Sequence, residues 1–307
     1  MKNMSKIRAV IFRALPLLCL AGLSSCNYGF FWGLFGEDNV DVRSSSMTSL
    51  NSSAPEIGKS LSEYSVLVIT DLHYGAHFGS DKERAFLDWL RKRFESGDEK
   101  KIPRFIVNLG DTADGGHRSE FSDYAAFAGR IKKLAEDCGI DGNYKVYSVL
   151  GNHDLYNNGV EHYEDLCYPY ISSYYFDIDV DAGGFGFYFL DTANGTLGPN
   201  QLEDLKSRLM LDPRPKIVFT HYPIYAGAND PKTVLMRLQN SMERNMILSY
   251  LTKYNARHVY EGHIHARMRF DFKIFREDVI QSFRYGEAAL LTVNAATGQV
   301  STEIVFF

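Results

Sequence analysis

Five short apolar runs, each of about strand length, end directly in polar clusters, and this repeat constrains the fold more than any other feature. The runs lie at 64–69, 105–109, 146–150, 216–219 and 258–260. Apolar runs of four to eight residues bounded by turn-forming residues are typical of buried β-strands. The sequence therefore predicts at least five strands, each carrying polar side chains at its carboxyl end.

Helical patterns separate several of these runs. Ser80 to Glu83 reads as a capping box that opens a helix with Phe86 and Leu90 on its apolar face. Further helical spacing occurs at 121–134, 202–209 and 236–254, and strand-rich stretches follow at 268–275, 282–293 and 300–307. Alternating strands and helices predict an α/β fold, in which active sites lie at the carboxyl ends of strands. We expect the stretches beyond residue 265 to supply a second sheet.

The polar clusters contain the side chains that divalent metal ions prefer. The candidate ligands are Asp71, His73, Asp111, Asn152, His221, His263 and His265. Imidazole, carboxylate and amide groups without thiolate suit Zn, Mn or Fe. Two of the clusters are i, i+2 pairs, whose side chains share one face of an extended chain. Any one of these clusters could be an ordinary polar loop that follows a strand and binds no metal. Five such clusters in this order are not explained in that way.

The complete series resembles the calcineurin-like metallophosphoesterase superfamily. The motifs are Asp71-x-His73, Gly110-Asp111-x-x-Asp114, Gly151-Asn152-His153-Asp154, His221 and Gly262-His263-x-His265. The resemblance implies an α/β (α+β) fold of two mixed β-sheets that form a central sandwich flanked by helices. It also implies a metal-dependent phosphoric ester hydrolase, acting on a small phosphoester as phosphatase or phosphodiesterase.

The resemblance also assigns roles to individual residues. One divalent ion is bound by Asp71, His73 and His265, a second by Asn152, His221 and His263, and Asp111 bridges both. A water or hydroxide between the ions is the expected nucleophile. His153 is the expected general acid, with Asp154 holding its ring, and Asp114 is expected to orient a loop or a ligand histidine. Purple acid phosphatases have an iron-binding tyrosine at the position of Asp114, which argues against a ferric-tyrosinate site here.

Composition narrows the partners but leaves the substrate open. The net charge is −5 and the pI about 6, so no strong nucleic-acid signal is present. Two rival functions remain: a catalytically inactive metal-binding scaffold and a nuclease. The loops at 74–80, 156–173 and 222–233 are expected to select the substrate. Monoester or diester preference, the identity of the metals and the oligomeric state stay undetermined.

The N-terminus has the features of a membrane address. Basic residues precede an apolar stretch at 14–23, which ends in Leu23-Ser24-Ser25-Cys26 and resembles a lipoprotein signal peptide. We therefore expect a signal peptide at 1–25, a lipid anchor on Cys26, a flexible tether at 26–60 and the metallophosphoesterase domain at 61–307. The protein would be extracytoplasmic, in the periplasm or at the cell surface. The alternative is an uncleaved anchor, because residues 14–35 carry no charge and are long enough to span about 30 Å.

For several other residues the sequence does not decide between a structural and a functional role. Cys138 and Cys167 form either a disulfide or two separate thiols. Tyr74 and Tyr222 either line a pocket or pack in the core. A surface or packing role is expected for the histidines outside the motifs, which are His77, His117, His162 and His258. The motif glycines at 110, 151 and 262 are expected to allow tight turns.

Overall fold

The computed structural model describes residues 39–76, 80–227 and 231–307. The predicted signal peptide, its Cys26 and His77 lie outside these residues. Within the described ranges, every helix is too short or too polar to cross a membrane.

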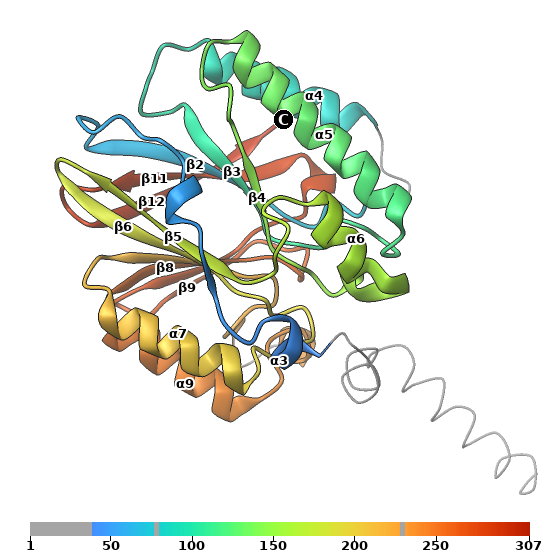
Figure 1. The fold of residues 1–307 in the computed structure, drawn as a ribbon, viewed down its shortest axis with the longest axis vertical. Coiled ribbons are helices and arrows are strands. Elements are labelled where there is room, and N and C mark those ends of the chain that lie inside the picture. The colour runs from blue at the N-terminus through green and yellow to red at the C-terminus, as the bar shows by residue number, and fades with distance from the viewer. Residues whose placement is uncertain (1–38, 77–79, 228–230) are drawn as a thin grey trace, which may run out of the picture.

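Two mixed β-sheets form the centre of the fold (Figure 1). The five-stranded sheet has the order β12 (Gln299–Phe306), β11 (Glu287–Asn294), β2 (Glu63–Ile69), β3 (Pro103–Asn108) and β4 (Val146–Ser148). The seven-stranded sheet has the order β1 (Thr48–Ser49), β5 (Tyr174–Val180), β6 (Gly183–Phe189), β7 (Lys216–Phe219), β8 (Ala256–Glu261), β10 (Arg276–Val279) and β9 (Met268–Asp271). Both sheets contain parallel and antiparallel neighbours, which confirms the predicted sandwich.

Helices cover the outer face of each sheet (Figure 1). The five-stranded sheet packs against α4 (Ser80–Phe94), α5 (Arg118–Asp137) and α6 (Gly159–Leu166), and the seven-stranded sheet against α7 (Pro199–Leu211) and α9 (Ser241–Lys253). The short helices are α3 (Val40–Arg43), η1 (Asn51–Ser53), η2 (His153–Asn158), α8 (Pro231–Leu235) and η3 (Phe283–Tyr285). The predicted helix at 236–254 begins only at Ser241, because the Asn240 side chain caps it by accepting from the backbone N–H groups of Met242 and Glu243.

Aromatic side chains fill the space between the sheets. Phe105 of β3 lies with its ring centroid 5.7 Å from that of Phe176 in β5 and 5.6 Å from that of Phe187 in β6. Burial of such rings is a large source of stability, and their edge-to-face contacts fix how the sheets are placed. Within each sheet the site-bearing strands run parallel, β2–β3–β4 in one and β6–β7–β8 in the other. Their carboxyl ends therefore bring the predicted polar clusters together.

The expected origin of the second sheet is wrong. Strands β11 and β12 complete the first sheet, while β9 and β10 extend the second, which is built around β5 and β6. Neither β5 nor β6 was predicted from the sequence. Strand β11 is buried along most of its length, so it fits between β2 and β12, whereas the half-exposed β9 fits an edge.

The predicted flexible tether also differs from the structure, because its residues 39–53 are part of the folded domain. Val40 and Met47 are buried, and β1 pairs in parallel with β5 through Thr48 and Tyr174. These apolar residues stand singly in a Ser-rich stretch, so no periodicity reveals them. The domain therefore begins well before residue 61.

The structure decides between the alternatives that the sequence left for two cysteines and shows the surroundings of two histidines. Cys138 and Cys167 are separate thiols. His258 is buried, with its Nε2 2.7 Å from a carboxylate oxygen of Asp278, which agrees with the expected packing role. His162 lies edge-on near Phe121, with ring centroids 6.5 Å apart.

Candidate metal centre and active site

All seven predicted metal ligands meet at the carboxyl ends of the parallel strands. Asp71 and His73 follow β2, Asp111 follows β3, Asn152 follows β4, His221 follows β7, and His263 and His265 follow β8. They form two groups that share Asp111. The ligand atoms of Asp71, His73, Asp111 and His265 lie within 4.8 Å of one another, and so do those of Asp111, His221 and His263.

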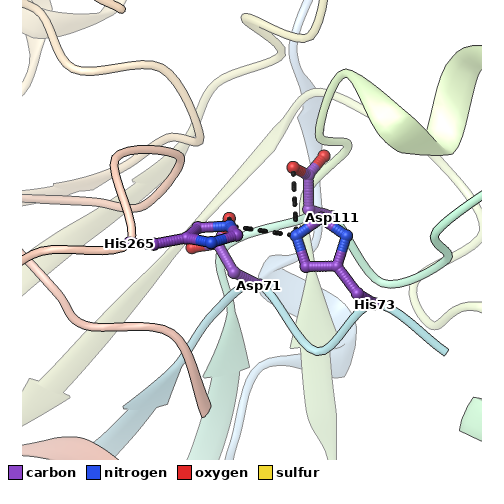
Figure 2. A group of neighbouring side chains, drawn as sticks. All are labelled: Asp71, His73, Asp111 and His265. Carbon is purple, nitrogen blue, oxygen red and sulfur yellow. Dashed lines mark hydrogen bonds and ion pairs between the residues drawn. The ribbon is translucent and has the colours of Figure 1, made fainter. Parts of the chain in front are cut away.

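The first group is shown in Figure 2, where the side chains of Asp71, His73, Asp111 and His265 converge from opposite sides of the site. The Nε2 atoms of His73 and His265 are 3.0 Å apart, and the Nε2 atom of His265 is 3.2 Å from Oδ1 of Asp71. Oδ2 of Asp111 lies 3.7 Å from Nε2 of His73.

The second group lies on the other side of Asp111. Nε2 of His221 is 3.3 Å from Oδ1 of Asp111 and 3.2 Å from Oδ1 of Asn152. The imidazole of His263 completes the group, with its ring centroid 5.1 Å from that of His221. The two carboxylate oxygens of Asp111 therefore face different groups.

The backbone at five of the seven candidate ligands is held in an unfavourable conformation. The positive φ values are 53° at Asp71, 51° at His73, 48° at Asp111, 69° at His263 and 52° at His265. Such left-handed residues cost of order 1–3 kcal/mol each and concentrate at functional sites. Backbone hydrogen bonds from Asp71 to Gly110 (3.0 Å) and from His73 to Asp111 (2.9 Å) hold the loops together. The i, i+2 pairs thus converge through left-handed turns, not through the extended chain expected from the sequence.

The three motif glycines serve two different needs. Gly110 has a φ of 96°, as expected for a tight turn. At Gly151 a Cβ atom would lie 2.1 Å from the backbone nitrogen of Asp111, and at Gly262 it would lie 2.1 Å from Oγ1 of Thr70. These two positions require glycine because neighbouring loops approach closely.

The chemistry of the donor set fits a bound cation. Nδ1 of His221 lies 2.8 Å from the carbonyl oxygen of Leu109 and donates to it, so Nε2 faces the acceptor oxygens of Asp111 and Asn152. Acceptors gathered away from water repel one another unless a proton or a cation lies between them. The residues present therefore match a divalent ion bound by imidazole, carboxylate and amide groups.

In the ion-free chain, a proton on His221 supplies part of the positive charge that the clustered acceptor oxygens require. Burial opposes charging of the His221 ring, but the carboxylates of Asp111 and Asp71 raise its pKa to about 9. Burial and the neighbouring His221 lower the pKa of His263 to about 3, which leaves that ring neutral. Burial alone would raise the pKa of Asp111, yet His221 and the other nearby histidines hold it well below its usual value.

The structure corrects the expected partner of His153. Nδ1 of His153 lies 2.7 Å from the carbonyl oxygen of Asp114 and 4.0 Å from its Oδ1. Asp114 also contacts His73, with Oδ1 3.1 Å from Nδ1, in agreement with the expectation that it orients a ligand histidine. The His153 side chain remains 33% exposed, so an ester can reach it.

Asp154 supports the loops and does not hold the ring of His153. Its carboxylate is fully buried and accepts from the backbone N–H groups of Ala113 (2.8 Å) and Gly151 (2.9 Å). Burial and the nearby charge of Asp111 raise the pKa of Asp154 to about 7. Sequence order placed Asp154 next to His153, but the 3₁₀ turn of η2 directs the two side chains to different partners.

Two tyrosines lie beside half-buried histidines of the site. Tyr222 stacks on His263, with ring centroids 3.9 Å apart and an interplanar angle of 31°. The ring centroid of Tyr156 lies 5.1 Å from that of His153. Tyr156 belongs to a loop that was expected to select substrate, although no role was predicted for this residue. Tyr74 instead packs in the core and donates to Glu83 (2.7 Å).

His117 lies outside the predicted ligand groups. Its side chain is exposed, and it caps the start of α5, where its backbone N–H donates to Glu120 (3.0 Å).

Comparisons with known proteins agree with this geometry. The family described as calcineurin-like phosphoesterase matches residues 64–267. A Fibrobacter succinogenes protein named as a probable cyclic nucleotide phosphodiesterase is 26% identical over 203 residues, covering 63% of this chain and 71% of its own.

Two solved structures show the same fold at low sequence identity. The Plasmodium protein GAP50, described as the anchor in the inner membrane complex, is 16% identical with a TM-score of 0.56, covering 80% of this chain and 84% of its own. A purple acid phosphatase from yellow lupin is 13% identical with a TM-score of 0.50, covering 82% of this chain and 55% of its own. At these identities the likeness concerns the fold alone.

Proposed function

Since this chain belongs to the calcineurin-like phosphoesterase family and is a metal-dependent phosphoester hydrolase, we propose that it uses two divalent ions and works outside the cytoplasm, tethered to a membrane by its N-terminus. The observation that carries the two-ion proposal is the position of Asp111. Its Oδ2 faces the group of His73, and its Oδ1 faces the group of His221. A carboxylate placed between two sets of donors is suited to bridge two ions.

The individual residues have the following roles in this proposal. Asp71, His73 and His265 hold one ion, and Asn152, His221 and His263 hold the other. Bound ions of this kind supply positive charge that stabilises the phosphoryl oxygens and makes water a better nucleophile. Asp114 fixes the ring of His73 through Nδ1, and its carbonyl oxygen fixes that of His153. Because Nδ1 of His153 donates to this carbonyl, Nε2 is the ring nitrogen left for the ester, and the doubly protonated ring delivers its Nε2 proton to the leaving alkoxide.

A phosphodiester with a ring-bearing organic part is the substrate class that we would test first. The Fibrobacter relative is named for cyclic nucleotides, and the rings of Tyr156 and Tyr222 flank His153 and His263 of the site. Aromatic faces bind flat organic groups through stacking.

Turnover and metal content measured together test this proposal. The full chain, purified in detergent, is stripped of metal and reloaded with Mn, Zn or Fe. Aryl phosphate, bis-aryl phosphate and a cyclic nucleotide are then compared. We expect two ions per chain and metal-dependent turnover that favours the diesters. Two ions without turnover would favour the scaffold alternative, a use of the fold in keeping with the anchor described for the Plasmodium protein. Cleavage of DNA would revive the nuclease.

Metal binding should depend on pH in a defined direction. His221 must be neutral to bind an ion, and its pKa is raised to about 9 in the ion-free chain. Below that pH each ion bound there displaces one proton, so apparent affinity should rise about tenfold per pH unit and level off above about pH 9. Chelator competition at a series of pH values measures the slope. An affinity that does not change between neutral pH and pH 9 would contradict the assignment of His221 as a ligand.

The membrane tether is a separate proposal that rests on the sequence before residue 39. The segment ending in Cys26 supports a cleaved lipoprotein, and its charge-free extension supports the uncleaved anchor as the alternative. Mass spectrometry of the mature N-terminus distinguishes them. A lipid-modified Cys26 is the expected result, and an intact Met1 would exclude the lipoprotein.

A further inference from the structure

The segment Asn39–Ser49 lies outside the family-matched region but is tied to the domain by a buried ion pair. Nε of Arg43 lies 2.6 Å from Oδ2 of Asp191, and Nη2 donates to Oδ1 at 3.0 Å. Ser44 donates a further hydrogen bond to Asp191 (2.7 Å), and the two charged side chains are 2% and 0% exposed. In Figure 1 this segment, in blue, runs beside α7 and along β5.

Asp191 is the second residue after β6, and the next residue, Thr192, contacts the loop that carries His221. The hydroxyl of Thr192 accepts from the backbone N–H of Tyr222 (2.9 Å) and shares a hydrogen bond of 2.7 Å with the hydroxyl of Thr220. Thr220 and Tyr222 are the two chain neighbours of His221. The ring of Tyr222 in turn stacks on His263.

We propose that Arg43 and Thr192 are positioning residues for the ion bound by Asn152, His221 and His263, so that the segment preceding the family-matched region supports one half of the metal centre. The proposal rests on the two-metal function proposed above. Removal of Arg43 leaves the Asp191 carboxylate buried without its cation, which is strongly unfavourable, so the loop must rearrange. Movement of Thr192 then releases both neighbours of His221.

The other half of the centre has different support. Asp71 is held through its carbonyl oxygen, which accepts from Ser282 (2.8 Å), and its loop pairs with Gly110. Substitutions in the segment Asn39–Ser49 should therefore weaken the binding of one ion and leave the binding of the other unchanged. A role in general stability alone would not produce this selectivity.

The experiment is a metal titration of the full chain with Co²⁺ after stripping, comparing wild type with Arg43→Ala, Thr192→Val and His263→Ala. Partners that support a ligand from outside typically contribute 10- to 100-fold in metal affinity, so we expect one of the two ions to bind about 10- to 100-fold more weakly in the first two variants. The remaining ion should match the one that His263→Ala retains. Arg43→Lys should recover part of the affinity, because it restores the charge without the paired hydrogen bonds.

Arg214→Ala is the matched control. Arg214 also joins carboxylates, Asp179 (2.9 Å) and Asp212 (3.1 Å), but it precedes β7, at the end of that strand opposite to His221. We expect this variant to keep both ions. The inference is wrong if folded Thr192→Val binds both ions as tightly as wild type. It is also wrong if Arg214→Ala loses the same ion. If Arg43→Ala does not fold, Thr192→Val alone provides the test. A wild-type chain that binds fewer than two ions would overturn the proposed function first.

Discussion

Replacement of Asp111 by asparagine is expected to weaken both metal sites together and to lower turnover by about a thousandfold or more. Asparagine keeps the size of the side chain but removes its negative charge and one acceptor oxygen. In this structure the two carboxylate oxygens face different ligand groups, at 3.7 Å from His73 and 3.3 Å from His221. Ions contribute several kcal/mol of transition-state stabilisation, and about 1.4 kcal/mol corresponds to a tenfold change in rate.

The comparison that makes this prediction specific is Asp71→Asn. Asp71 is equally buried and carries the same chemistry, but the ligand side chain it meets is that of His265 in the first group, at 3.2 Å, and it reaches the second group only by accepting from the backbone N–H of His263. Metal analysis after dialysis should find that Asp111→Asn loses both ions and that Asp71→Asn loses one. Two ions retained by Asp111→Asn would show that Asp111 does not bridge.

That the candidate ligands lie close together was predictable from sequence because each follows a strand. His221 follows β7 of the other sheet and joins the site through the packing of the two sheets. A parallel strand places the residue after its carboxyl end at one edge of its sheet, so Asp71 and Asp111 had to meet once their strands were recognised. That inference needs only local pattern and survives errors in the sheet order. The candidate ligands converge although β5 and β6 were not predicted and β11 and β12 were expected in the other sheet.

Contacts within the loops were not predictable in the same way. The sequence places Asp154 beside His153, but which group holds the His153 ring depends on the left-handed turns and close loop approaches around Asp111 and Gly151. The ring of His153 is held by the backbone carbonyl oxygen of Asp114, at 2.7 Å, and not by the carboxylate of Asp154. Arg43 shows the same limit at longer range, because its partner Asp191 is 148 residues away and neither residue belongs to a motif.

Replacement of His153 by alanine should affect esters according to their leaving groups. Alkyl esters release a basic alkoxide that needs a proton in the transition state, so we expect their turnover to fall by about 10²- to 10⁴-fold. Nitrophenyl esters release a stable anion and should lose much less. The position of His153 favours this role: its Nδ1 is fixed at 2.7 Å from the Asp114 carbonyl, and the ring lies 4.7 Å from that of His73, at the rim of the metal centre.

The control for this prediction is His117→Ala, since His117 is exposed at the start of α5 and lies outside the predicted ligand groups. It should leave both ester classes unchanged. Metal content must be measured in His153→Ala as well, because the backbone N–H of His153 donates to Asp111 (2.9 Å) and a shift there would disturb the ions. With two ions retained, equal losses on alkyl and nitrophenyl esters would mean that His153 binds the phosphoryl group instead of protonating the leaving oxygen, since binding of that group is common to both ester classes.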